Sequence, residues 1–365
     1  MGRNEKCWCD SGVKWKKCHA IREFEKALPA AAHLHELRKQ LEFEICLHPD
    51  APNECSSAIA RAHTIQRNGG LSEIAEDGHV LSGRDSSLSN SLANEESDLS
   101  LVGVRSASTF RGFCAKHDGQ TFRPADIATE ISSEVAFLLA YRALAYEVYM
   151  KMIALPVMEK TKNLIDRGMN FENQANVQQE YNVGIQGFRA GLIEHQAHMS
   201  VYNNFYRDGN FEKFNFHLWE IEGDFPAVTS GTFFPEYTFD GRIIQSLNSQ
   251  IGFLSLLAFN IVYINHRCFL VFGWIDDIKC ANEIFCESLS KFACEDVGDI
   301  LVRFCFETSD NIFVRPSWWG GRSDLQRHEL LDRLRQSMPG SHASNGLMLG
   351  GLHYLDEKLT ARRLR

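Results

Sequence analysis

The chain has 365 residues, of which 44% are hydrophobic and 23% are charged, so it is long enough for two or three domains and apolar enough to bury a core. Its formal net charge of −9 excludes a polycation that coats nucleic acid by charge alone. No segment has the roughly 20 apolar residues of a membrane helix, and the N-terminus lacks the apolar run of a signal peptide, so we expect a cytoplasmic protein with no membrane partner.

Residues 1–20 carry three cysteines and a histidine at close spacing. Cys7 and Cys9 are separated by one residue, and Cys18 and His19 follow as an adjacent pair after eight more residues. Zinc takes four tetrahedral ligands from thiolate and imidazole groups, and Gly12 lets the intervening loop turn back. We therefore predict a structural zinc site, whose metal supplies the folding free energy that so small a segment cannot obtain from a core.

This segment resembles the SEC-C motif, a short zinc-binding module. Besides the four ligands, the resemblance rests on Gly2-Arg3-Asn4, Ser11-Gly12, Lys14 and Lys16-Lys17. Trp8 and Asp10 depart from the usual proline and glycine, which alters the turn without changing a ligand. The resemblance implies a docking module for a protein partner, with no open coordination position for zinc catalysis.

A helical connector is predicted over 21–45, because apolar residues recur there at helical spacing. The segment 46–127 then lacks a helical period, and its part 82–100 has the composition of a mobile loop. Two further ligand pairs lie in this segment: Cys46 with Cys55, and Cys114 with His117. They predict a second zinc site, in which His48 is an alternative to either cysteine of the first pair; the other interpretation is four unrelated residues.

Between these two pairs the sequence reads Arg61-Ala62-His63-Thr64-Ile65, and this arrangement resembles an HNH endonuclease of the ββα-metal type on a treble-clef zinc scaffold. The resemblance implies that His63 is the general base that activates water. It also implies that Asp118 holds a catalytic Mg²⁺ or Mn²⁺ at the scissile phosphate.

Two positions depart from that family. Ala62 precedes the base, where histidine or aspartate is common, and Phe122 stands where a second metal-binding histidine often lies. Asn68 and His79 are the candidates for the polar residue that orients the base.

The rest of the chain alternates between helical and strand patterns. Apolar faces predict a helical hairpin over 130–210, and an α+β domain is predicted over 214–340, followed by a C-terminal tail over 341–365. Within that domain we expect strands at 232–239, 257–264 and 268–275, with Asn265-His266 as a hairpin turn. Helices are expected at 281–292, 297–306 and 324–337.

The predicted fold class is therefore α+β, with a zinc knuckle, a small HNH-like domain, a helical hairpin and a C-terminal domain. The expected function is a metal-dependent HNH-type endonuclease that acts on DNA, in defence against foreign DNA. The alternative is a non-catalytic adaptor, dependent on one or two structural Zn²⁺ ions, that binds nucleic acid, a ribosome or a protein partner. The sequence gives no indication of the oligomeric state.

Overall fold

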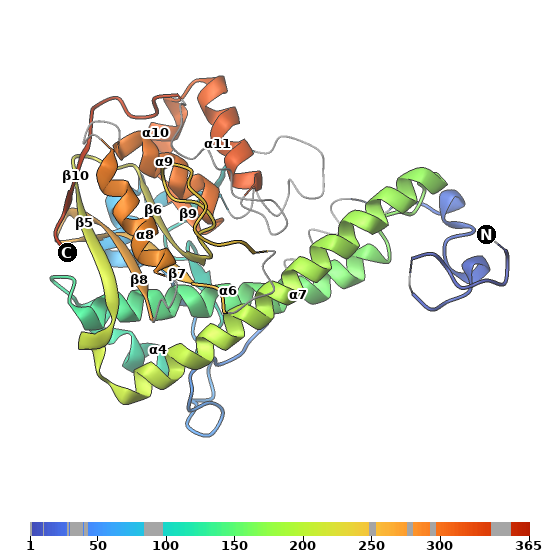
Figure 1. Ribbon diagram of the computed structural model, residues 1–365, viewed down its shortest axis with the longest axis horizontal. Coiled ribbons are helices and arrows are strands. Elements are labelled where there is room, and N and C mark those ends of the chain that lie inside the picture. The colour runs from blue at the N-terminus through green and yellow to red at the C-terminus, as the bar shows by residue number, and fades with distance from the viewer. Residues whose placement is uncertain are drawn as a thin grey trace. The chain divides into compact units, whose positions relative to one another are not determined.

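The computed structural model divides the chain into two compact units, Met1–Phe43 with Met150–Ile193 and Glu44–Tyr149 with Glu194–Arg365. The two long helices α6 (Ser133–Lys162) and α7 (Phe171–Asp208) contribute residues to both units (Figure 1). The structure describes residues 2–9, 11–27, 29, 39, 43–83, 98–247, 253–275, 280–292, 297–336 and 352–365. Most of the loop expected over 82–100, most of the connector expected over 21–45 and part of the expected tail lie outside the described residues.

The first unit combines the N-terminal segment with residues 150–193, which contain the end of α6 and the beginning of α7. Its N-terminal segment contains two short 3₁₀ turns, Trp15–Lys17 and Arg22–Phe24. Residues 163–170 connect the two helices, and Gly168 in this connection has φ +77°, a conformation that favours glycine. A Cβ at Gly168 would also lie 3.1 Å from the carbonyl oxygen of Glu25, so the close approach of the two segments requires the missing side chain.

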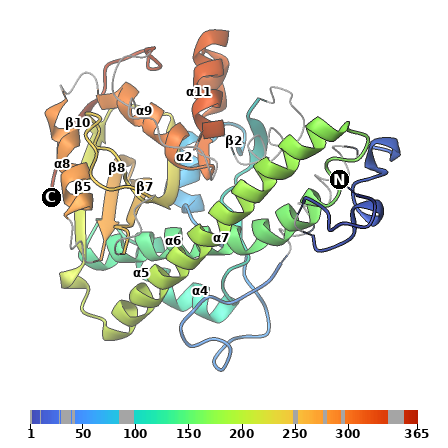
Figure 2. The same ribbon diagram turned by 45° about the vertical axis from the view of Figure 1, so that its right-hand side comes forward.

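The second unit is built on an eight-stranded antiparallel sheet with the order β10-β5-β8-β7-β6-β9-β2-β3. Strands β5, β8 and β7 lie side by side in Figure 2. The strands are β2 (His79–Ser82), β3 (Ser100–Gly103), β5 (Asn215–Glu222), β6 (Ala227–Phe233), β7 (Leu257–Ile264), β8 (Arg267–Trp274), β9 (Ile312–Val314) and β10 (Thr360–Arg363).

Two segments join this sheet from outside the range 214–340. Strands β2 and β3 come from within 46–127, and β2 pairs with β9 through Leu81 and Val314. Strand β10 comes from the segment expected to be a tail, and it pairs with β5 at the sheet edge. The sheet therefore contains strands from three regions that were predicted as separate from the sequence, namely 46–127, 214–340 and 341–365.

Helices cover both faces of the sheet within this unit. Successive residues of a strand point to opposite faces, so Phe272 and Gly273 of β8 show what lies on each side. The Phe272 ring is 5.7 Å from that of Phe304 in α9 (Val297–Thr308). A Cβ at Gly273 would lie 3.5 Å from Cβ of Ala140 in α6, on the opposite face.

The remaining helices are short apart from α11. They are α2 (Ser72–Ile74), α4 (Ala115–Thr121), α5 (Arg123–Asp126), α8 (Ala281–Ser288), α10 (Pro316–Gly320) and α11 (Asp324–Gln336), together with a π-helical turn Arg67–Leu71 and 3₁₀ turns Phe211–Lys213 and Leu289–Lys291. Within the described residues, none of the helices is both long enough and apolar enough to cross a membrane.

One expected strand was misplaced, whereas one expected turn is confirmed. The strand predicted at 232–239 is β6, which already ends at Phe233, because Pro235 cannot donate a backbone hydrogen bond to a neighbouring strand. Asn265 and His266 have φ of 50° and 64° and connect β7 to β8 in register, as a two-residue hairpin turn requires.

Candidate metal centres and the adjoining histidine site

The four N-terminal ligand candidates form one compact cluster, with all ligand atoms of Cys7, Cys9, Cys18 and His19 within 4.8 Å of one another. Nδ1 of His19 lies 3.2 Å from Sγ of Cys7 and 3.1 Å from Sγ of Cys18. Tetrahedral zinc with ordinary bond lengths places sulfur about 3.5 Å from nitrogen and about 3.8 Å from a second sulfur. The spacing therefore fits a zinc ion, and the prediction of a Cys/His cluster suited to zinc is confirmed.

The thiols of this cluster crowd one another. Burial, together with the neighbouring Cys9, raises the pKa of Cys18 to about 12. A bound dication reverses this, because it stabilises each thiolate directly. Two further thiols and an imidazole beside the Cys18 sulfur form a donor set that suits such a cation.

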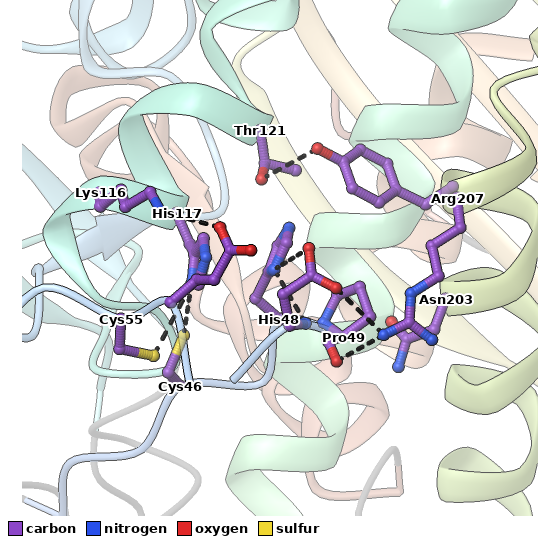
Figure 3. Close-up of polar contacts among 12 residues, drawn as sticks. Cys46, His48, Pro49, Cys55, Lys116, His117, Thr121, Asn203 and Arg207 are labelled. Atoms are coloured by element: carbon purple, nitrogen blue, oxygen red, sulfur yellow. Dashed lines mark hydrogen bonds and ion pairs between the residues drawn. The ribbon is translucent and has the colours of Figure 1, made fainter. Parts of the chain in front are cut away.

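A second cluster brings together Cys46, Cys55, Cys114 and His117, again with all ligand atoms within 4.8 Å. Nδ1 of His117 is 3.4 Å from Sγ of Cys46 and of Cys114, and 3.8 Å from Sγ of Cys55. Figure 3 shows the Cys46 and Cys55 thiols turned toward the His117 ring. These distances fit the same tetrahedral geometry, so the chain has two clusters that could hold zinc.

Local backbone structure explains why these four residues meet. Cys114 is the N-cap of α4, and its sulfur accepts a hydrogen bond from the His117 amide. Backbone bonds from Leu47 to Gly112 (2.9 Å) and from Ala60 to Phe113 (2.9 Å) hold the preceding segments on either side of this helix start. Burial opposes ionisation of Cys114, but hydrogen bonds from the His117 amide and Ser56 lower its pKa to about 7.

His48 is not one of the cluster residues. Its ring stacks on the His117 ring, with centroids 3.9 Å apart, and its Nδ1 accepts a hydrogen bond from the Asp50 amide. Burial and the adjacent His117 lower the pKa of His48 to about 4, so the stacked ring is neutral at neutral pH. His48 supports the ligand His117 instead of replacing a cysteine.

Contacts from α7 hold the loop that follows His48. Arg207 donates to the carbonyl oxygen of Pro49 at 2.7 Å, as Figure 3 shows. It also donates to Oδ1 of Asp50 at 3.1 Å. The Tyr206 hydroxyl donates to Oγ1 of Thr121 in α4 at 3.4 Å.

His63 lies on a two-stranded hairpin that leads to the second cluster. Strand β1 (Ala62–His63) pairs with β4 (Thr109–Phe110), and α4 begins five residues after β4. The chain order is thus strand, strand and helix, with β2 and β3 inserted between the two strands.

The imidazole of His63 has one ring nitrogen without a partner. Within the described residues, Nε2 is buried and makes no hydrogen bond, and the main chain of Val104 acts on the ring so as to raise its pKa. Burial and the nearby Arg142 and Arg67 lower the pKa of His63. The lowered pKa favours the neutral imidazole at neutral pH, and the side chain of Asn68 lies outside the described residues.

Asp118, in the first turn of α4, also has an unsatisfied buried atom. Its Oδ1 makes no hydrogen bond to the described residues, and burial raises the pKa of this carboxyl group against the opposing effect of Arg142. Arg142 is held by both carboxylate oxygens of Asp126, at 2.9 and 3.2 Å, and its guanidinium lies 4.2 Å from the ring centre of Phe122. The Arg142–Asp126 pair acts electrostatically on both His63 and Asp118, so all four belong to one charged neighbourhood.

Two features of this neighbourhood were missed from the sequence. Arg142 stands within an apolar helical run, which is a signal that a buried charge has a partner. Nothing in the sequence pointed to the effect of the Val104 main chain on the His63 ring, because any residue supplies a backbone. Within the described residues, neither His63 nor Asp118 belongs to a group of three or more side chains that could hold a metal.

Comparison with known proteins supports only the N-terminal module. A family model described as the SEC-C motif matches residues 3–20, which include all four ligands of the first cluster. No family model for an HNH domain matches, and neither a curated protein nor a solved structure matches the chain. The chain therefore carries a SEC-C motif at residues 3–20, and these comparisons indicate neither the fold nor the function of the remainder.

Proposed function

We propose that this protein is an HNH-type endonuclease that hydrolyses DNA with His63 as the general base. The second cluster, the hairpin β1–β4 and helix α4 would form its treble-clef scaffold. The observation that carries the proposal is that, within the described residues, Nε2 of His63 and Oδ1 of Asp118 are both buried polar atoms without hydrogen-bond partners in one charged neighbourhood. A buried polar atom without such a partner is available to a ligand or a reacting group.

The chemistry follows from the state of each group. Neutral His63 takes a proton from water at Nε2 as the water oxygen forms a bond to phosphorus, and the bond from phosphorus to the leaving sugar oxygen breaks. The leaving oxygen is protonated from solvent. The lowered pKa of His63 keeps its ring neutral at neutral pH, so the imidazole is able to accept this proton.

Asp118 is the residue that would hold Mg²⁺ or Mn²⁺. Its unsatisfied Oδ1 suits a hard cation, and Mg²⁺ is commonly bound by one or two carboxylates together with substrate phosphates. Such a cation supplies charge stabilisation at the phosphate oxygens.

Replacement of His63 by alanine is expected to lower the rate of supercoiled plasmid cleavage by about 10²–10⁴-fold in Mg²⁺ or Mn²⁺, because loss of a general base costs that factor. The matched control is His79→Ala, which removes an exposed histidine from β2 of the same unit. Zinc content should be unchanged in both variants. Absence of cleavage by the parent protein, or equal cleavage by His63→Ala, would refute the nuclease.

The cleavage rate should also report the protonation state of His63. Its pKa lies below the ordinary 6.5, and only the neutral form is a base, so the rate rises with pH through the lowered pKa and then becomes level. Single-turnover cleavage measured across this range checks the expectation. A rate that still climbs steeply above neutral pH would show that another group limits the reaction.

A second candidate is a non-catalytic adaptor whose two zinc modules bind nucleic acid, a ribosome or a protein partner. The specific observation in its favour is that fully buried Phe122, covered by the Arg142 guanidinium, occupies the position of the family's second metal ligand. Salt-sensitive DNA binding without cleavage would favour this candidate.

A further inference from the structure

His19, a ligand candidate of the first cluster, uses both of its ring nitrogens. Nδ1 points to the sulfur atoms of Cys7 and Cys18, so Nε2 must point away from the cluster. Nε2 lies 2.7 Å from Oδ2 of Asp166, and the side chains of His19 and Asp166 are 1% and 0% exposed. A fully buried carboxylate is retained only where partners offset its desolvation.

Asp166 lies in the 163–170 connection between α6 and α7, far along the chain from the cluster but in the same unit. Its second oxygen, Oδ1, pairs with the guanidinium of Arg22. One partner of this carboxylate is thus the cluster ligand His19, and the other, Arg22, lies three residues after it.

Other contacts hold the same two segments together. The Gly168 amide donates to the Arg22 carbonyl oxygen at 2.8 Å, and Arg167 pairs with Glu25 at 3.1 Å. The Trp8 ring lies 4.8 Å from the His19 ring and 5.8 Å from the Phe171 ring, at the start of α7. The cluster is therefore docked on the 163–170 connection through a carboxylate, a backbone bond and an aromatic contact.

We infer that Asp166 is the outer partner of the metal ligand His19, so that zinc binding in the first cluster is coupled to docking of the N-terminal segment on the 163–170 connection. The carboxylate faces Nε2 at an ion-pair distance of 2.7 Å, so it favours the tautomer with the proton on Nε2, which leaves Nδ1 free for zinc, and it raises the basicity of the imidazole. Asp166 is a positioning residue, since it acts on the metal only through His19.

The coupling works in both directions. Loss of zinc releases His19 from its fixed orientation and leaves the Asp166 carboxylate with one buried partner fewer. Loss of the carboxylate weakens zinc binding, typically by about 10–100-fold for such outer partners. The inference does not depend on the nuclease, because it concerns only the first unit.

The first test measures zinc release from the native full-length protein to a chromophoric chelator. Asp166→Ala should release one of the two zinc ions about 10–100-fold faster than the parent, and Asp166→Asn, which keeps a neutral acceptor, should fall between them. The second zinc ion is an internal control and should leave at the parent rate. Glu159→Gln, which removes an exposed ion pair with Arg189 in the same unit, should change neither.

The second test needs no change at Asp166 and so does not depend on how its variants fold. In a Cys9→Ser variant, which disables only the first cluster, amide hydrogen exchange should speed up at Gly168 and its neighbours in 163–170. Unchanged exchange there, or equal zinc release from Asp166→Ala and the parent, would overturn the inference.

Discussion

Replacement of Cys114 by serine is expected to remove one zinc ion per chain and to unfold the region around the second cluster. Serine keeps the N-cap function at the start of α4, so the variant removes a metal ligand with little loss of capping. Structural zinc sites contribute an apparent binding free energy of about 10–16 kcal/mol in small zinc modules, comparable with the whole stability of a typical domain.

Elemental analysis of the purified variant, together with hydrogen exchange at 45–65 and 109–121, measures the effect. The parent should contain two zinc ions and the variant one. Cys280→Ser is the matched control, because this thiol is exposed and belongs to neither cluster. A Cys114→Ser protein with two zinc ions and unchanged exchange would show that the cluster does not hold a structural metal.

Replacement of Phe304 by alanine is expected to lower the free energy of unfolding of the second unit by about 3–5 kcal/mol. Phe304 of α9 is fully buried, and its ring centre lies 5.0 Å from that of Phe259, 5.7 Å from Phe272 and 5.8 Å from Phe233. Truncation leaves a cavity at the junction of three strands, and closely packed aromatic rings relax poorly around it.

Urea unfolding followed by circular dichroism measures this loss. The control is Leu325→Ala in α11, whose side chain is 64% exposed, and its effect should stay within about 0.5 kcal/mol. A similar small loss for Phe304→Ala would mean that α9 does not anchor the sheet as the packing indicates.

The sequence predicted the ligands of both clusters better than it predicted the parts of the sheet. Cys7, Cys9, Cys18 and His19 lie within thirteen consecutive positions, so a short loop must bring them together once the metal binds. Cys114 and His117 have the spacing of one helical turn, which places both at the start of α4. The end of β6 was predicted less well, because Pro235 and the pairing of β6 with other strands determine where it ends.

Local spacing and ligand chemistry thus determined the first cluster from the sequence alone and predicted the second as one of two interpretations, and the structure brings the residues of both together. Only the tertiary structure decided that His48 stacks on a ligand, that Asp166 meets His19, and that β2, β3 and β10 complete one sheet. The physical reason is that metal ligands close short loops at low entropic cost, whereas these other contacts join residues far apart in the chain. Tertiary packing determines which residues meet in these contacts, and no local sequence pattern indicates it.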